Sequence, residues 1–397
     1  MNQTLWTKDF IIIFIANFFV ALTFYVLMTT LTLYAVEQFH ASQSMAGLAS
    51  SIFIIGALFS RLFAGKYIEV IGRKKMIYWG LLLFLLTILL YFPVHQLDVL
   101  LVVRFIHGVS FGIAANAMST AVMDMVPLER RGEGTSYYAS SATTATAIGP
   151  FIGLYITEHT VFSMIFVLCT IFSVISIIFT LFMKVPEATL TEQQLQALKK
   201  GFSLQNSLEK KAIPISIIMF LMGIAYSGIV TFLHSYATEF NLTEAAGLFF
   251  IVYAVFLLLS RPMTGRLLDV KGDNMVIYPA LLLFSLSLLL LHLAHHSFTV
   301  LLAGAFTALG FGTFISSAQA IAVKVSPKHR IGLATSTFFI CLDGGMGIGP
   351  ILTGMLIPLV GFRGMYLTLS VFVVLSIILY YFVHGKHVAS KQKARVF

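Results

Sequence analysis

Long runs of apolar residues, separated by short polar segments, follow one another along nearly the whole chain. About 20 residues of apolar helix cross a bilayer core of about 30 Å, and most of these runs reach that length. The pattern therefore predicts an all-α membrane protein with twelve transmembrane helices. Six are expected at 9–36, 43–64, 77–95, 99–122, 134–157 and 161–184, and six more at 213–237, 244–264, 276–296, 298–322, 332–357 and 361–384.

Composition supports a membrane protein and excludes a soluble fold. Of the 397 residues, 58% are hydrophobic and 10% are charged, whereas roughly 25% are charged in an average soluble domain. The first apolar run is too long for a signal peptide and is followed by eleven similar runs, so we expect it to be retained. Cys169 and Cys341 fall inside predicted spans and are interpreted as packing residues, without a disulfide or a metal site.

Basic residues indicate the orientation of the spans. If the N-terminus is inside, every Lys and Arg except Arg104 and Arg363 falls on a segment that faces the cytoplasm. Positively charged segments resist translocation, so we expect both termini to be cytoplasmic, in a multi-pass protein of the cell (plasma or inner) membrane. The net charge of +9 then reflects topology and anionic lipid at the inner leaflet, and no nucleic acid partner is expected.

The two halves of the chain resemble each other at an offset of 200 residues. Four separate motifs share this offset: 61–65 with 261–265, 111–112 with 311–312, 127–132 with 327–332, and 149–150 with 349–350. We therefore predict an N-terminal six-helix bundle at 1–184, a cytoplasmic linker at 185–212, and a C-terminal bundle with a short tail at 213–397. Transporters built from two parallel repeats bind solute near the bilayer midplane and alternate its exposure by rocking one half against the other.

Two segments resemble motifs of the major facilitator superfamily. Residues 65–75, between the second and third spans, resemble its loop signature of glycine, acid, glycine and a basic run. Residues 101–108 resemble the motif of its fourth helix, which bears an arginine, here Arg104. The resemblance covers the whole chain. It implies the major facilitator fold, a monomeric carrier, and similarity to the twelve-helix drug/proton antiporters.

The chain departs from the family pattern at three places. Glu69-Val70 replaces the usual aspartate and arginine of the loop signature, and Asp273-Asn274 replaces a basic pair in its second copy. The glycine-proline signature that drug antiporters carry in helix five is reduced to a few residues here, and it recurs in helix eleven. It is consistent with antiport or with a feature of the repeat.

By the same resemblance, residues at the cytoplasmic helix ends and in the glycine-proline motif control conformation by latching the two halves in one state. We expect Asp124 to pair with Arg73, and the acids of the two loop signatures to lie at helix ends that favour negative charge. An ordinary solvated ion pair is the alternative. The residues assigned to this role are Gly65, Glu69, Gly72, Arg73, Asp124, Gly265, Asp269, Gly149, Pro150, Gly349 and Pro350.

Asp343 is the one acid that falls near the middle of a predicted span. A carboxylate there costs about 2.5–3.5 kcal/mol on insertion scales, so it needs a reason to be present. One hypothesis is that it carries a proton or neutralises a cationic solute. The other is a structural hydrogen bond or a pairing with an interior base. Its equivalent in the first half, Thr143, is uncharged.

Arg104 lies in the outer part of the fourth predicted span, with His107 one turn further on the same face. The family resemblance implies that this arginine takes part in proton coupling or solute binding, and a histidine can titrate near neutral pH. The alternative is that Arg104 extends to the outer membrane surface. Asp343, Arg104 and His107 are therefore the proton-coupling candidates.

Other polar residues inside the spans are candidates for the solute cavity, because a polar group at membrane depth needs a partner. The residues chosen, together with Asp343, are Asn17, Tyr25, Asn116, Tyr137, Tyr138, Tyr226, His234 and Tyr253. His292, His295 and His296 cluster at the outer end of the ninth span, where an interfacial position is expected in preference to a metal site.

These features predict a secondary transporter, not an enzyme, that exports small amphipathic or cationic molecules in exchange for protons. The alternative is a proton-coupled carrier of a polar metabolite such as a sugar, an amino-acid derivative or a metal-chelating metabolite. A remote alternative is a membrane receptor that does not transport. The chain lacks the G-x-x-x-x-G-K-[ST] nucleotide motif, so a proton gradient is the expected energy source and no cofactor is expected. Small solutes, protons and membrane lipids are the expected partners.

Overall fold

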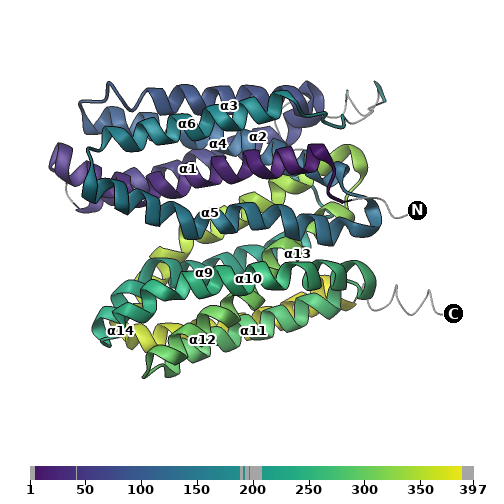
Figure 1. The fold of residues 1–397 in the computed structure, drawn as a ribbon. Helices are drawn as coiled ribbons and strands as arrows, with labels where there is room; N and C mark the ends of the chain where they lie inside the picture. The colour runs from purple at the N-terminus through teal and green to yellow at the C-terminus, as the bar shows by residue number, and fades with distance from the viewer. Residues whose placement is uncertain (1–4, 42, 188–190, 193–195, 197–207, 387–397) are drawn as a thin grey trace. The chain divides into compact units, whose positions relative to one another are not determined.

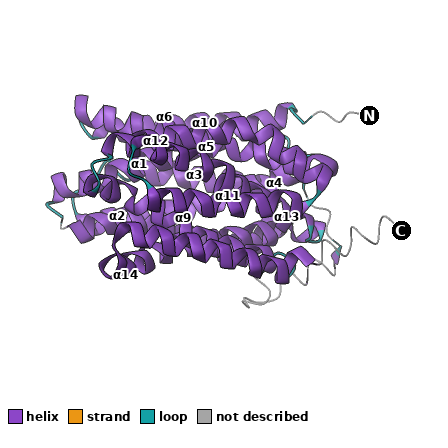
Figure 2. Cartoon of the chain, turned by 90° about the horizontal axis from the view of Figure 1, so that it is seen from below, coloured by secondary structure: helices purple, strands orange, loops and turns teal. Residues whose placement is uncertain are grey.

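The computed structural model describes residues 5–41, 43–187, 191–192, 196 and 208–386. All regular structure in these residues is helical, as Figure 2 shows, and this confirms the predicted all-α class. Most of the predicted linker at 185–212, and the tail beyond residue 386, lie outside the described residues.

The first half forms one helix for each predicted span. These are α1 (Lys8–Phe39), α2 (Gln43–Ile71), α3 (Arg73–Leu89), α4 (Leu97–Met125), α5 (Arg131–His159) and α6 (Ser163–Leu181). A short turn of 3-10 helix, η1 (Leu128–Arg130), precedes α5. The prediction of 77–95 for the third span was displaced, because the basic run after Gly72 forms the first turn of α3. Gly72 has φ +100°, so it separates α2 from α3.

The second half repeats this order. It contains α9 (Ile213–Glu239), α10 (Thr243–Lys271), α11 (Asp273–Leu293), α12 (Ser297–Thr307), η2 (Ala308–Gly312), α13 (Thr313–Lys324), η3 (Lys328–Arg330), α14 (Ile331–Tyr380) and η4 (Tyr381–Gly385). The predicted span 298–322 is interrupted by the π-helical turn η2. The last two predicted spans form the single long element α14, which breaks at Gly361, where φ is +70°. That break coincides with the predicted boundary at 357–361.

Eight helical stretches among the described residues are long and apolar enough to cross a membrane, so the chain is a multi-pass membrane protein. The difference from the twelve predicted spans has simple causes. The last stretch contains two predicted spans, α3 has 17 residues, and α2 contributes only the shorter apolar stretch Ser51–Gly65. Helix α5 is rich in Ala, Ser, Thr and Gly, which lowers its hydropathy.

The described helices divide into two compact units. The first unit comprises Met1–Pro127, Ser141–Glu209 and Pro327–Thr337, and the second comprises Leu128–Ser140, Lys210–Ser326 and Phe338–Phe397. The units follow the two halves of the sequence but exchange two short segments. The start of α5 belongs to the second unit, and the start of α14 belongs to the first.

Within the first unit, α4 packs against α2 and α3, and α1 packs against α6 (Figure 1). Glycines allow the backbones of α2 and α4 to approach closely. A Cβ on Gly56 would lie 2.2 Å from the Phe105 carbonyl oxygen, and a Cβ on Gly108 would lie 2.0 Å from that of Phe53. Small residues at such crossings are typical of membrane helices, which gain their stability mainly from close packing.

The second unit packs in the equivalent way, with α12 against α10 and α11. A Cβ on Gly304 would lie 2.9 Å from the Phe249 carbonyl oxygen, and a Cβ on Gly312 would lie 2.5 Å from a methyl carbon of Leu257. Both close approaches join residues 55 positions apart, so they fix one register between α10 and the α12–η2–α13 segment.

Candidate functional site

A buried charge network occupies the cytoplasmic end of the first unit. Arg73 is fully buried, and its Nη2 and Nε atoms donate to the two carboxylate oxygens of Glu69 at 2.8 and 3.2 Å. Its Nη1 atom donates to Asp124 at 2.5 Å, which is the contact expected between these residues. Burial raises the pKa of the Glu69 carboxyl, and the charge of Arg73 opposes that shift. The network therefore depends on Arg73 and its two acids together.

The N-terminus of α3 belongs to the same network. The backbone N–H groups of Arg73 and Lys74 donate to the Glu187 carboxylate at 2.7 and 3.0 Å. The first N–H groups of a helix have no partner within the helix, so an acid is favourable there. Sequence reasoning counted Glu187 only as a linker charge, because nothing in its neighbours signals a distant helix end.

The acid of each loop signature contacts the start of a helix from the other half of the sequence. Within the first unit, Glu69 accepts a hydrogen bond of 3.2 Å from the N–H of Gly332, near the start of α14. Within the second unit, Asp269 accepts from the N–H groups of Gly132 and Glu133, at the start of α5, at 2.8 and 3.0 Å. Both acids therefore lie at helix N-termini, as expected.

The conserved spacing of glycines permits these contacts at short range. A Cβ on Gly65 would lie 2.3 Å from the Ser336 Cβ, and a Cβ on Gly265 would lie 2.5 Å from the Glu133 Cα. The hydroxyl of Ser336 also donates to the Arg61 carbonyl. Larger residues at either glycine would separate the loop-signature helix from the helix start that it touches.

The second unit contains a charge-reversed version of the Arg73–Asp124 pair. Asp273 and Lys324, each 200 residues further along, form an ion pair with 3.2 Å between Nζ and Oδ1. Asp273 also contacts His384 Nε2 at 3.0 Å. The departure of the second loop signature is thus matched by an opposite change at its partner. Sequence reasoning missed Lys324, although the 200-residue offset from Asp124 would have indicated it.

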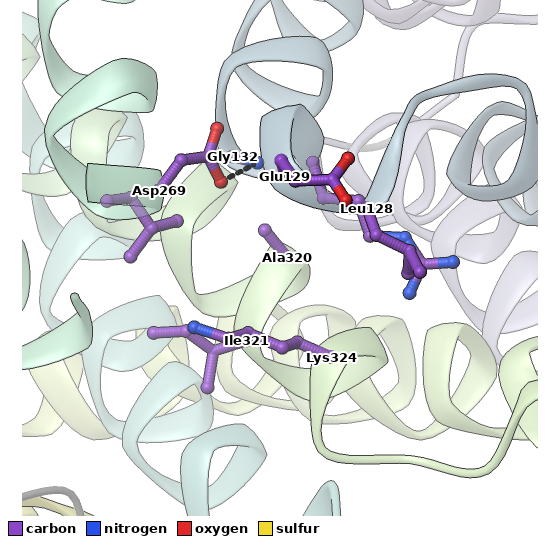
Figure 3. Close-up of a pocket in the computed structure, with 9 residues that line it drawn as sticks. Leu128, Glu129, Gly132, Asp269, Ala320, Ile321 and Lys324 are labelled. Atoms are coloured by element: carbon purple, nitrogen blue, oxygen red, sulfur yellow. Dashed lines mark hydrogen bonds between the residues drawn. The ribbon is translucent and has the colours of Figure 1, made fainter. Parts of the chain in front are cut away.

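A small cavity of about 70 Å³ lies beside Asp269 in the second unit (Figure 3). Its lining includes Glu129, Gly132, Ala320, Ile321 and Lys324, and the Gly132–Asp269 hydrogen bond crosses its edge. Ligand pockets usually occupy roughly 300–1,000 Å³. This cavity is therefore part of the helix-end network and is too small for a cargo molecule.

Arg104 and His107 are both fully buried inside the first unit. Arg104 donates from Nε to the Ala49 carbonyl at 3.3 Å and stacks over the Phe53 ring at 4.4 Å. His107 Nδ1 lies 3.0 Å from the Tyr91 hydroxyl. Burial shows that Arg104 does not extend to the surface of the unit. Its Nη1 and Nη2 atoms, and His107 Nε2, make no hydrogen bond within the described part of the chain.

The cavity candidates of the first unit occupy different environments. Asn17 donates to Ser141 at 2.8 Å, and Asn116 is fully buried without a hydrogen-bond partner for its amide among the described residues. Tyr25 packs on a cluster around Ala21 and Phe172. The structure does not bring these residues into one cavity.

Among the remaining candidates, Tyr226 stacks on Phe311 with ring centroids 3.9 Å apart and lies 6.2 Å from Tyr253. These rings form an aromatic cluster inside the second unit. Tyr138 is buried and Tyr137 is partly buried, both near the start of α5. His234 lies in α9 and Pro150 in α5, but their side chains are outside what the structure describes.

Asp343 lies in α14 and is half-buried. The glycines near it bring α14 against α9: a Cβ on Gly345 would lie 2.2 Å from the Phe220 carbonyl oxygen, and one on Gly349 would lie 1.9 Å from Ser227 Oγ. In the first unit, a Cβ on Gly149 of α5 would lie 2.7 Å from the Tyr25 Cβ of α1. The glycine-proline motif therefore serves close helix packing in both halves.

The histidine cluster at the end of α11 contacts Arg363. His292 Nδ1 lies 3.0 Å from the Arg363 carbonyl oxygen, and His295 Nδ1 lies 3.2 Å from Arg363 Nη2. Arg363 also stacks over Phe240 at 4.2 Å. A search of the described residues finds no group of His, Cys, Asp or Glu that could hold a metal ion.

The sequence was compared with known proteins. It matches the family model described as Major Facilitator Superfamily over residues 13–279 and 215–396. Multidrug resistance protein 2 of Bacillus subtilis is 25% identical over 311 residues, which cover 77% of this chain and 78% of that protein. The staphylopine export protein of Staphylococcus aureus is 23% identical over 354 residues, which cover 85% and 87% of the two chains.

The fold was compared with solved structures. The crystal structure of the human organic anion transporter MFSD10 superposes with a TM-score of 0.74 at 15% sequence identity. The match covers 94% of this chain and 99% of that chain. It confirms the major facilitator fold.

Proposed function

Because the chain belongs to the Major Facilitator Superfamily, we propose that this transporter exports small amphipathic molecules from the cell in exchange for protons. It would act in the cell membrane with both termini in the cytoplasm, as the distribution of basic residues indicates. The names of two relatives, a multidrug resistance protein and a staphylopine export protein, support export as the direction.

The observation that carries proton coupling is the half-buried carboxylate of Asp343, placed where α14 approaches α9 closely. An ionisable side chain inside a transmembrane helix is expensive, and it is usually retained for transport of ions or substrate. One proton moving through about 150 mV supplies roughly 3.5 kcal/mol. That energy sustains a cargo gradient of roughly 300-fold, since about 1.4 kcal/mol corresponds to a factor of ten.

The helix-end charges have a different role in this proposal. Glu69 and Asp269 each contact a helix start that must move if the halves rock. They would stabilise one conformation and would not contact cargo. Their hydrogen bonds to backbone N–H groups break and re-form once in each transport cycle.

A polar metabolite is the second candidate cargo, and two observations favour it. One is the staphylopine export protein among the relatives. The other is the buried Arg104, whose Nη1 and Nη2 atoms make no hydrogen bond within the described residues. An interior guanidinium suits a carboxylate-bearing metabolite better than a lipophilic cation.

Dye efflux from intact cells tests the proposal. Cells that express the chain should accumulate less ethidium, or less of a fluorescent amphipathic carboxylate, than cells with an empty vector, and a protonophore should remove the difference. Asp343→Asn should accumulate dye like the empty vector, whereas Asp98→Asn, which changes an exposed acid, should behave like the parent. Efflux that is insensitive to the protonophore would overturn proton-driven export.

A further inference from the structure

Arg261 is a buried cation without a counter-ion. It lies in α10, its side chain is 2% exposed, and its Nε and Nη1 atoms have no hydrogen-bond partner among the described residues. A guanidinium stays protonated in proteins, and burying an uncompensated charge costs several kcal/mol. A group of this kind is expected to bind an anion for at least part of the working cycle.

The register of α10 against α13 places hydroxyl groups at the level of Arg261. Gly304 approaches Phe249 and Gly312 approaches Leu257, both with a separation of 55 residues. The same separation puts Arg261 level with Ser316, between Thr313 and Ser317. The hydroxyls of Thr313 and Ser317 are buried and, within the described residues, accept and donate no hydrogen bond.

The start of α5 adds a third hydroxyl at this level. Gly132 and Glu133 contact Asp269 and Gly265 of α10. The two helices run in opposite directions, so one turn along α5 and one turn back along α10 bring Ser136 level with Arg261. The Ser136 hydroxyl is 1% exposed and has no partner among the described residues. In the first unit, the equivalent Ser336 donates to the Arg61 carbonyl, as this register requires.

The acids near this level are already engaged. Asp269, two turns from Arg261 on α10, accepts from two backbone N–H groups, and Glu133 pairs with Arg130 at 2.8 Å. Two turns from Arg261 in the other direction, Tyr253 joins the aromatic cluster with Tyr226 and Phe311. The second unit therefore offers donors at one level and an aromatic surface next to it.

We infer that Arg261, with the hydroxyls of Ser136, Thr313 and Ser317, binds the carboxylate of an amphipathic anionic cargo in the second unit. The planar guanidinium matches a carboxylate with two parallel N–H···O bonds, and the aromatic cluster suits the apolar part of the cargo. The inference rests on the proposed export function and names its substrate class.

Thermal unfolding of the full chain in phosphatidylcholine nanodiscs tests this site without anionic lipid. Benzoate should raise the melting temperature of the parent, because a ligand that binds only the folded state stabilises it. Benzamide, a neutral molecule of nearly the same shape, should not. Arg261→Met should weaken benzoate binding at least tenfold. Arg266→Met, which removes an exposed arginine from the same helix, should leave it unchanged.

Two further measurements keep the inference falsifiable. Without ligand, Arg261→Met should melt at or above the parent temperature, because it removes an uncompensated buried charge; a lower temperature would show that Arg261 is only structural. Ser136→Ala, a small change, should weaken benzoate binding several-fold. Equal shifts with benzoate and benzamide, or an unchanged benzoate shift in Arg261→Met, would overturn the site.

The outcomes separate this inference from the proposed function. If Asp343-dependent efflux of ethidium is intact and benzoate does not bind, the carboxylate site is wrong and proton-driven export stands. If benzoate binds through Arg261 and no dye efflux depends on protons, the site stands and proton-driven export is wrong.

Discussion

Glu69 has two contacts that involve the same carboxylate. It forms an ion pair with the buried Arg73 and also accepts a hydrogen bond from the start of α14. The helix end contributes partial positive charge and the arginine a full one, so both favour the ionised acid. Burial opposes them by raising the pKa of Glu69. A neutral side chain at this position would keep the shape and lose the electrostatic part.

We therefore expect Glu69→Gln to lower the free energy of unfolding by about 2–3 kcal/mol. This is less than the roughly 3–5 kcal/mol for a fully uncompensated buried charge, because Asp124 still pairs with Arg73. Unfolding in detergent with increasing denaturant would measure it. Glu37→Gln, at an exposed position of α1, should change stability by less than about 0.5 kcal/mol. Equal effects of the two substitutions would contradict the buried network.

The charge-reversed pair of the second unit gives a second prediction. Lys324 is 58% exposed, so Lys324→Gln should cost at most about 1 kcal/mol of stability. Asp273→Asn should cost more, about 2 kcal/mol, because Asp273 is buried and also contacts His384. The double variant Asp273→Lys with Lys324→Asp should recover part of the loss of Asp273→Lys alone. If the double variant is no more stable than Asp273→Lys, the two residues do not interact.

At this scale the sequence predicted some contacts and missed others for physical reasons. The Arg73–Asp124 pair was predictable because a family motif supplied one partner and helix position the other. Glu187 was not, because its contact with the start of α3 joins residues 114 apart with no periodic pattern between them. Arg261 drew no attention because it was counted as a topology-setting charge at an inner helix end.

At the scale of helices, close packing depends on glycines where backbones cross. Apolar length predicted most helix positions well, because spanning a bilayer constrains length directly. It misplaced the third span, since Arg73 is charged yet buried and helical. It also gave no sign of the π turn at Ala308–Gly312. There Gly310 lies against α11, and a Cβ on it would be 2.4 Å from the Phe284 N atom.

Gly108→Ala tests the packing of α4 on α2. The added methyl group would lie 2.0 Å from the Phe53 carbonyl oxygen, and overpacking of this kind typically costs about 1–3 kcal/mol. Gly247→Ala is the matched control, because nothing lies within 4 Å of its position in α10. The control should be neutral or up to about 1 kcal/mol more stable, since alanine favours the helix. Thermal unfolding compares them. A neutral Gly108→Ala would mean that α2 and α4 are further apart.

At the scale of the whole molecule, the repeat organises both the fold and the site. The offset of 200 residues predicted two bundles, and the compact units follow the two halves except at the starts of α5 and α14. No sequence pattern predicted that exchange, because it depends on where Glu69 and Asp269 find helix ends in space. The family match fixes transport as the activity, whereas cargo and coupling rest on single side chains.

The most direct test of proton-driven export is cargo-dependent proton movement in proteoliposomes with an imposed pH gradient. Adding tetraphenylphosphonium or benzoate should collapse the gradient faster in vesicles that contain the parent than in empty vesicles, beyond any leak that the cargo causes by itself. Asp343→Asn should reduce that difference at least tenfold, and Asp98→Asn should preserve it. If Asp343→Asn moves protons with cargo as fast as the parent does, Asp343 is structural and the coupling mechanism proposed for this transporter is wrong.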